Sequence, residues 1–142
     1  HNANSALIQG KRLVLIDDSI VRGTTSLKIV QMLRDAGARE VHMRIASPPT
    51  RHSCFYGVDT PERAKLLAAQ MNVAQMNDYI KADSLAFLSI DGLYRALGEE
   101  IRDEANPQHC DACFTGQYPT RLTDHEEHES VDQLALLAER YA

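Results

Sequence analysis

The chain has 142 residues, of which 44% are apolar and 25% charged, and its formal net charge is −5 with histidine counted as neutral. A chain of this length forms one domain that buries roughly 68–70% of its unfolded surface. The acidic balance argues against a nucleic-acid surface, and no apolar run approaches the roughly 18 residues that a membrane helix needs. We therefore expect neither nucleic acid nor a membrane as a partner.

The first ten residues show no clear secondary-structure pattern. The first convincing apolar run begins at Leu13, and the chain has no initiating methionine. We therefore expect residues 1–10 to be the end of a segment that begins upstream, so that the chain is a piece of a longer protein.

A strand, a helix and a second strand are predicted in the next part of the chain. The run "LVLI" (13–16) is continuously apolar and branched, which is typical of a strand buried on both faces of a parallel sheet. "TTSLKIVQMLRDAGA" has a helical apolar stripe that stops at Gly37, and "REVHMRIAS" alternates like a strand. This order predicts a βαβ unit with a right-handed crossover and parallel strands, and hence an α/β fold.

The remaining elements are predicted from caps, prolines and short apolar runs. They are a loop over 47–61, a helix from Thr60 and Pro61 to about Ala69, a helix over 73–80 capped by Asn72, a strand over 84–89, a helix over 90–101 capped by Ser89, a polar loop over 103–123, and an amphipathic helix near the C-terminus.

The stretch "LIDDSIVRGTTS" carries the most specific chemistry. Asp17 and Asp18 follow the first strand, at the end where open α/β sheets bind ligands. The loop around Gly23 leads into a helix whose first amides lack internal partners and favour an anion such as phosphate. Because the carboxylates would repel that phosphate, they must face another part of the ligand, either sugar hydroxyls or a bound Mg²⁺. The stretch therefore predicts a site for a phosphorylated sugar.

The same stretch also has a simpler interpretation. Two acidic residues and a Ser/Thr-rich turn also occur as ordinary helix capping. The stretch contains neither a Walker loop nor a dinucleotide-binding G-x-G-x-x-G.

The three cysteines, Cys54, Cys110 and Cys113, include one C-x-x-C pair. An odd count favours a cytosolic metal or redox role over a secreted disulfide framework. Zinc, an iron–sulfur cluster, a redox pair and buried inert thiols all remain open on spacing alone.

Several stretches together resemble the amidophosphoribosyltransferase family. "VLIDDSIVRGTTS" is similar to the phosphoribosyl pyrophosphate (PRPP) signature of type I phosphoribosyltransferases, and "CFYGVDTP", "ADSLAFLS" and "CDACFTGQYP" follow in the family's order. The resemblance covers nearly all of residues 10–120. One departure is Ser53, which stands where the family pattern has proline before Cys54.

The resemblance implies the C-terminal part of a type I phosphoribosyltransferase fold, a parallel sheet flanked by helices with a helical C-terminal extension. It divides the chain into the end of an upstream segment (1–10), a partial phosphoribosyltransferase core (11–100), and a cysteine-containing loop with a C-terminal helix (101–142). The residues expected to bind PRPP are Asp17, Asp18, Ser19, Arg22, Gly23, Thr24, Thr25 and Ser26.

The resemblance also implies cofactors. Asp17 and Asp18 would hold the ribose hydroxyls and assist Mg²⁺. One branch of the family carries a [4Fe–4S] cluster on four cysteines. Three of these ligands match Cys54, Cys110 and Cys113 here, and the fourth would lie outside this chain. The family's glutaminase nucleophile is an N-terminal cysteine, so no catalytic residue of that half is expected in this segment.

The implied activity is that of the enzyme that makes 5-phosphoribosylamine from PRPP and glutamine, the first committed step of purine biosynthesis. This segment would supply the ribose-5-phosphate loop and have little activity alone. The implied partners are PRPP, glutamine and purine nucleotide feedback inhibitors, in a cytoplasmic homo-oligomer. The alternatives are a regulatory module that binds PRPP or a nucleotide without turnover, and a small metal- or redox-binding protein built on the cysteines.

Overall fold

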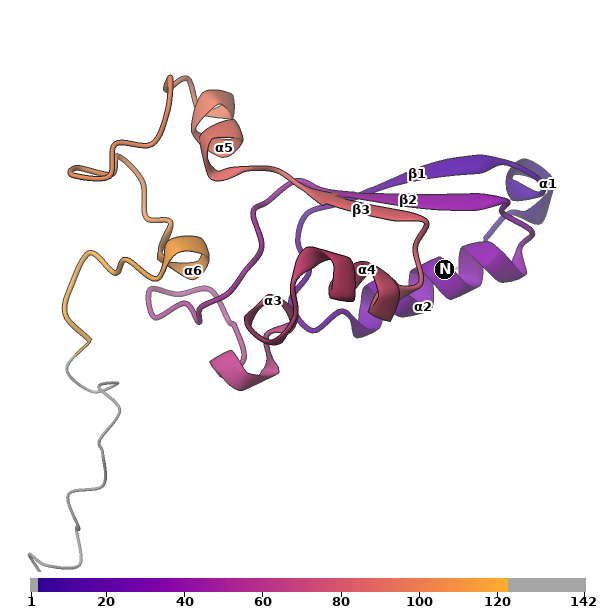
Figure 1. Cartoon of the computed structure of the whole chain (residues 1–142), viewed down its shortest axis with the longest axis horizontal. Coiled ribbons are helices and arrows are strands. Elements are labelled where there is room, and N and C mark those ends of the chain that lie inside the picture. The colour runs from indigo at the N-terminus through magenta and orange to yellow at the C-terminus, as the bar shows by residue number, and fades with distance from the viewer. Residues whose placement is uncertain (1–2, 123–142) are drawn as a thin grey trace, which may run out of the picture.

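The structure, a computed structural model, describes residues 3–122 of the chain, so the helix expected near the C-terminus lies outside the described residues. Three strands and several helices alternate along the sequence (Figure 1). In order they are α1 (Ser5–Ile8), β1 (Arg12–Asp17), α2 (Thr24–Asp35), β2 (Glu40–Ile45), the 3₁₀-helix η1 (Arg63–Lys65), α3 (Leu67–Gln70), α4 (Val73–Ile80), β3 (Ser84–Phe87), α5 (Ile90–Ala96) and α6 (Ala112–Thr115).

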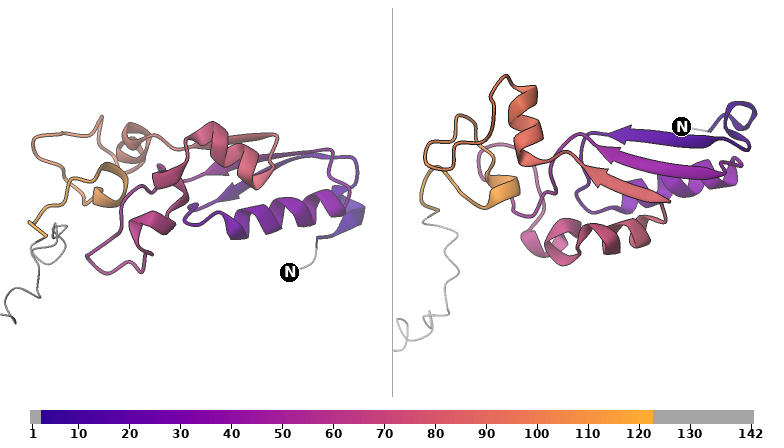
Figure 2. Two further views of the ribbon diagram at one scale, coloured as in Figure 1. Left: turned by 60° about the horizontal axis from the view of Figure 1, so that its bottom comes forward. Right: turned by 45° about the horizontal axis from the view of Figure 1, so that its top comes forward.

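The strands form one parallel sheet in the order β1-β2-β3. Arg12 pairs with Glu40 and Asp17 with Ile45, so β1 and β2 end at the same edge. Helices α2 and α4 pack on one face of the sheet (Figure 2). The predicted α/β fold, with a parallel sheet flanked by helices, is confirmed.

The core lies between this face of the sheet and the two helices. Alternate residues of β2 point into it, because successive side chains of a strand lie on opposite faces. The buried apolar cluster comprises Ile20, Val30, Ala38, Val41, Met43, Ile45, Leu67, Ala68, Met76 and Ile80.

The opposite face of β1 differs from the expectation of a strand buried on both sides. Leu13 and Leu15 pack against the core, but Val14 and Ile16 are 65% and 74% exposed. In the described part of the chain no helix lies over this face (Figure 1), so the prediction of burial on both faces is wrong for these residues.

Helix α4 begins where its sequence signals predict. Asn72 accepts a hydrogen bond from the Gln75 amide, and the Gln75 side chain accepts one from the Asn72 amide, both at 2.9 Å. This capping box satisfies two amides that would otherwise lack a partner at the helix end.

The helix predicted from Thr60 to about Ala69 is wrong. The segment instead forms η1 and α3, separated at Leu66, whose backbone is extended. Leu66 is fully buried, and the Leu67 amide donates to the Val21 carbonyl at 2.8 Å. Packing against the loop after β1 therefore outweighs the local helix signal. The Thr60 hydroxyl accepts a hydrogen bond from the Cys54 amide and caps nothing.

Other elements also differ from the sequence prediction. Helix α5 starts at the predicted cap, where the Ser89 hydroxyl accepts from the Gly92 amide, but it ends at Ala96 and not near residue 101. Gly98 has a positive φ of 96°, a conformation that ends helices. At the other end of the chain, α1 is an element that the sequence did not predict; Asn4 caps it and Ile8 packs against the core.

Among the described residues, no helix combines the length and the apolar character needed to cross a membrane.

We predict that Ile80→Ala destabilises the packing of α4 on the sheet by about 2–5 kcal/mol, because it leaves a cavity beneath a fully buried side chain. Hydrogen–deuterium exchange of peptides from β2 and α4, in a protein that contains this segment, measures the change. Val73→Ala on the same helix is the control, since Val73 is 37% exposed and its truncation should leave exchange nearly unchanged. Equal effects of the two variants would contradict this account of the core.

Candidate functional site

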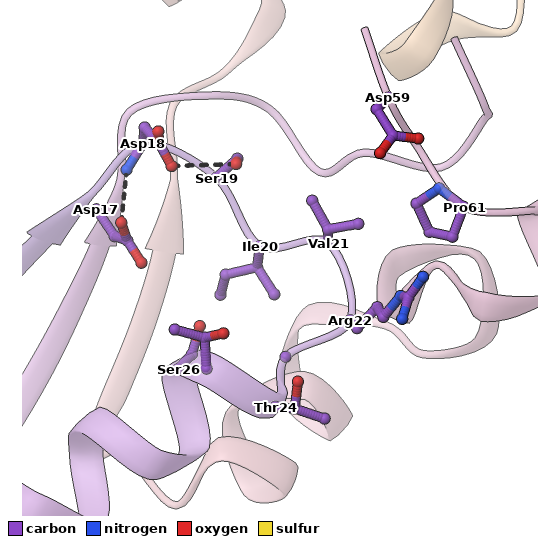
Figure 3. A pocket seen from close by; sticks show the side chains of 12 residues that line it. Asp17, Asp18, Ser19, Ile20, Val21, Arg22, Thr24, Ser26, Asp59 and Pro61 are labelled. Atoms are coloured by element: carbon purple, nitrogen blue, oxygen red, sulfur yellow. Dashed lines mark hydrogen bonds between the residues drawn. The ribbon is translucent and has the colours of Figure 1, made fainter.

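The candidate site begins where β1 ends. Asp17 is the last residue of the strand, and its carboxylate accepts a hydrogen bond from the Asp18 amide at 3.0 Å. The Ser19 hydroxyl donates to the Asp18 carboxylate at 3.1 Å (Figure 3). These short-range bonds hold both acidic side chains at the carboxyl edge of the sheet, where open α/β sheets bind their ligands.

Gly23 makes the turn from this loop into α2. Its φ of 75° lies in the left-handed region, and a β-carbon there would lie 2.6 Å from Leu67 Cδ2 and 3.0 Å from Tyr79 Cε1. Both the backbone conformation and the close packing therefore require glycine. The turn is fixed against α3 and α4, which gives the loop a rigid base.

The N-terminus of α2 faces the same space. Gly23 provides no side-chain cap, and the first turn, Thr24–Ser26, contains no acidic residue. The first amides of a helix have no internal acceptor, and the helix dipole adds partial positive charge there. This end of α2 is therefore suited to bind a phosphate group.

All eight residues expected to bind PRPP line one pocket of about 540 Å³. The pocket also includes Ile20 and Val21 of the same loop, and two residues from a second loop, Asp59 and Pro61. Asp59 and Pro61 are not among the residues predicted from the sequence. The predicted parallel pairing could have indicated them, because the loop after β2 leaves the sheet at the same edge as the loop after β1.

The pocket has two chemically different sides. Asp17 and Asp18 lie at the strand end, whereas Arg22 and Thr24 lie at the start of α2 (Figure 3). Asp59 approaches from the opposite loop. A ligand that carries hydroxyls or a cation at one end and a phosphate at the other would match both sides.

The cysteines lie in a separate region, on two segments that contact each other. The Arg51 and His52 amides both donate to the Cys113 carbonyl at 3.0 Å, which joins the loop of Cys54 to the turn of Cys113. The Tyr118 hydroxyl donates to the Ser53 carbonyl at 2.7 Å. The two segments therefore form one unit.

The thiol environments differ. Cys110 is exposed, whereas Cys54 and Cys113 are partly buried, and the Cys54 sulfur accepts a hydrogen bond from the Tyr56 amide at 3.4 Å. Burial raises the pKa of Cys113, and the neighbouring thiols of Cys54 and Cys110 raise it further. Within residues 3–122, however, no group of three or more His, Cys, Asp or Glu side chains is close enough to hold a metal ion.

Comparisons with known proteins point to one enzyme family, although no family model matches the chain. The chain is 62% identical over 139 residues to an amidophosphoribosyltransferase of Rhizobium etli, covering 97% of this chain and 28% of that protein. It is 57% identical over 118 residues to a chloroplastic amidophosphoribosyltransferase of Arabidopsis thaliana, covering 83% of this chain and 20% of that protein.

A solved structure agrees with these sequence matches. The glutamine PRPP amidotransferase of Bacillus subtilis, complexed with ADP and GMP, superposes with a TM-score of 0.79 at 49% identity. The match covers 87% of this chain and 27% of that one. The chain thus spans about a quarter of the length of the relatives that it matches.

The fold and the loop at the end of β1 define part of a phosphoribosyltransferase domain of the α/β class. More particularly, this segment belongs to the amidophosphoribosyltransferase family.

We predict that Gly23→Ala destabilises the segment by about 1–3 kcal/mol more than Gly10→Ala. Both glycines have a similar positive φ, 75° and 70°, so both variants carry the strain of a left-handed alanine. Only at Gly23 would the new methyl group meet packed side chains, since a methyl carbon at Gly10 would have no neighbouring atom within 4 Å. Urea denaturation of the two variants measures the difference, and equal destabilisation would contradict the close packing at Gly23.

Proposed function

We propose that the protein containing this segment converts PRPP and glutamine into 5-phosphoribosylamine, the first committed step of purine biosynthesis. The segment supplies the loop that binds the ribose 5-phosphate end of PRPP. The observation that carries the proposal is the two-sided pocket at the end of β1, within a segment that is 62% identical to an amidophosphoribosyltransferase.

Each side of the pocket has its own role in this proposal. Arg22, Gly23, Thr24, Thr25 and Ser26 hold the 5′-phosphate through amides, hydroxyls and the guanidinium group. Asp17 and Asp18 accept hydrogen bonds from the ribose hydroxyls, with Ser19 beside them. As pyrophosphate leaves, positive charge develops on the sugar, and the two carboxylates stabilise it.

Mg²⁺ is the proposed metal of this site. It prefers one or two carboxylates together with water and phosphate oxygens, so Asp17 and Asp18 fit it without a larger protein ligand set. The ion would neutralise the charge of the leaving pyrophosphate.

A [4Fe–4S] cluster is the proposed group at the cysteines, with Cys54, Cys110 and Cys113 as three ligands and the fourth outside this chain. The donor chemistry fits, since thiolates hold such clusters and the Tyr56 amide already donates to the Cys54 sulfur. In the described part of the chain, however, the three thiols do not converge into a group that could hold a metal ion, so their geometry does not support the cluster.

The remaining proposals concern partners and location. ADP and GMP accompany the Bacillus subtilis relative, which supports purine nucleotides as regulators here. We also propose a homo-oligomer in the cytoplasm, although some relatives are chloroplastic. We also propose that the chain divides into the end of an upstream segment (1–10), a partial phosphoribosyltransferase core (11–100), and a cysteine-containing loop with a C-terminal helix (101–142). This division rests on the similarity to the family.

A regulatory module that binds PRPP or a nucleotide without turnover is the alternative function. It uses the same pocket, so binding alone does not separate the two functions. Turnover does.

We predict that Asp17→Asn and Asp18→Asn each lower glutamine-dependent PRPP consumption by the full-length protein by about 100-fold, because each removes a charge that faces the sugar. Asp35→Asn is the control. Asp35 lies at the far end of α2, is exposed, and bonds only to Gln31 among the hydrogen bonds described, so its loss should change the rate by less than about twofold. A wild-type protein that binds PRPP without consuming it would refute the enzyme and support the regulatory module.

We predict that the full-length protein, purified without oxygen, contains about four iron atoms per protomer and absorbs near 400 nm. Cys113→Ser should abolish both signals, because it removes a proposed ligand. Iron analysis and an absorbance scan measure the effect. An iron-free wild-type protein would refute the cluster while leaving the PRPP site untouched.

A further inference from the structure

A second cavity, of about 460 Å³, lies between the loop after β2, the 3₁₀-helix η1 and the turn from α3 to α4. Its polar side chains are Arg51 and His52 from the loop, Arg63 from η1, Gln70 from the end of α3 and the α4 cap residue Asn72. None of its described lining residues is an aspartate or a glutamate, and none of them lines the proposed PRPP pocket. The cavity is therefore basic and separate from that pocket.

The two arginines of this cavity lack an acidic partner in the described part of the chain. Within residues 3–122, Arg51 and Arg63 form no ion pair and no side-chain hydrogen bond. Arg102 shows the contrast, because its Nε donates to the Asp111 carboxylate at 2.5 Å and both side chains are buried. The guanidinium groups of Arg51 and Arg63 are instead exposed, and all their donors are available to a ligand.

Neighbouring side chains do not neutralise the positive charge of the two arginines. Glu62 directly precedes Arg63, but its carboxylate contacts Lys65 at 3.3 Å and does not line the cavity. Burial lowers the pKa of His52, and the charges of Arg63 and Arg51 lower it further. Both guanidinium charges therefore act at one place, the His52 ring.

Contacts with the turn around α6 hold the first side of the cavity. The Arg51 and His52 amides both donate to the Cys113 carbonyl at 3.0 Å. The His52 ring also packs directly on Gly116, where a β-carbon would lie 2.8 Å from His52 Cε1. The backbone that carries Arg51 and His52 is therefore fixed.

Two side-chain hydrogen bonds hold the second side. The Ser53 hydroxyl donates to the Pro61 carbonyl at 2.9 Å, which joins the loop to the residues just before η1. The Gln70 side-chain amide donates to the Ala64 carbonyl at 2.6 Å, which joins η1 to the end of α3. Arg63, the first residue of η1, therefore lies on a segment that is attached to both neighbours.

Two available guanidinium groups on a fixed backbone favour an anionic ligand. Each guanidinium presents five N–H donors in a planar fork that binds carboxylate or phosphate through two parallel hydrogen bonds. A phosphate monoester carries about −1.5 to −2 charges at pH 7 and has three strong acceptor oxygens, so it can engage two arginines at once. A carboxylate has one charge and two oxygens, and it matches a single arginine better.

We propose that this cavity is a second anion site, in which Arg51 and Arg63 together bind a phosphate group. The ligand is either inorganic phosphate or the phosphate group of a small metabolite, since both present the same oxygens. The proposal is independent of the PRPP pocket, with which the cavity shares no residue, and it requires no metal.

Phenylglyoxal, which modifies accessible guanidinium groups, tests the proposal in the full-length protein, with each modified arginine located by mass spectrometry. Millimolar inorganic phosphate should slow the labelling of Arg51 and Arg63 by about tenfold relative to chloride at the same ionic strength, because the bound anion occupies both groups. Arg95 is exposed on α5 and lies outside the cavity, so its labelling rate should not change. Arg22 reports separately on the PRPP pocket.

Substitution of each arginine tests whether the two act together. Arg63→Gln should raise the phosphate concentration that half-protects Arg51 by about tenfold, and Arg51→Gln should do the same for Arg63, because each removes one set of charge-assisted hydrogen bonds. Arg95→Gln is the matched control, since it removes the same charge from another exposed position and should leave protection unchanged. Equal weakening by all three variants would show a general charge effect and overturn the site.

A second probe, ribose 5-phosphate, distinguishes the two sources of the phosphate group. Protection of Arg51 and Arg63 by inorganic phosphate alone identifies a site for the free ion, and protection at lower concentrations of ribose 5-phosphate identifies a site for a phosphorylated metabolite. Protection by neither probe would overturn the proposal. Protection of Arg22 alone would overturn this second site and leave the PRPP pocket supported, whereas protection of Arg51 and Arg63 without Arg22 would do the reverse.

Discussion

The candidate site depends on the parallel pairing of β1 with β2, which continues to Asp17 and Ile45 and stops there. The last ladder bond at this edge runs from the Ala46 amide to the Asp17 carbonyl at 2.9 Å. The loops after β1 and β2 therefore both begin at the same edge of the sheet. As a result, Asp59 and Asp17 line the same pocket although they are far apart in sequence. The first loop carries the acids and the helix N-terminus. The second loop contains Cys54 and, further along, the pocket residues Asp59 and Pro61. The loop after β2 therefore contributes both to the cysteine region and to the pocket.

Local chemistry allowed much of this arrangement to be predicted. The apolar run of β1, the stripe of α2, and the caps at Asn72 and Ser89 each act within a few residues, and each appears as expected. The eight loop residues were expected from the resemblance to the phosphoribosyltransferase signature, and they are contiguous or nearly so in the sequence. Their gathering in one pocket follows from a single turn at Gly23.

The features that were not predicted depend on long-range packing. Leu66 interrupts the predicted helix because the amide of the next residue, Leu67, donates to the Val21 carbonyl in the loop after β1. These residues are far apart in the sequence, so a local sequence pattern cannot predict the contact. The Arg102–Asp111 pair could not be predicted either, because aspartate before a short helix has an ordinary explanation as a cap. Burial on both faces of β1 was inferred from its continuously apolar sequence. That sequence does not show whether this part of the chain also contains the helices that would cover both faces.

The bare face of β1 has a practical consequence for handling this segment. Val14 and Ile16 present branched apolar side chains to solvent, and β1 is an edge strand of the sheet in the described part of the chain. An edge with open backbone groups beside apolar side chains is a template for strand addition by another molecule. Such an edge favours self-association when the segment is produced in isolation. Lysine at position 14 or 16 would be the economical substitution for keeping it monodisperse at high concentration.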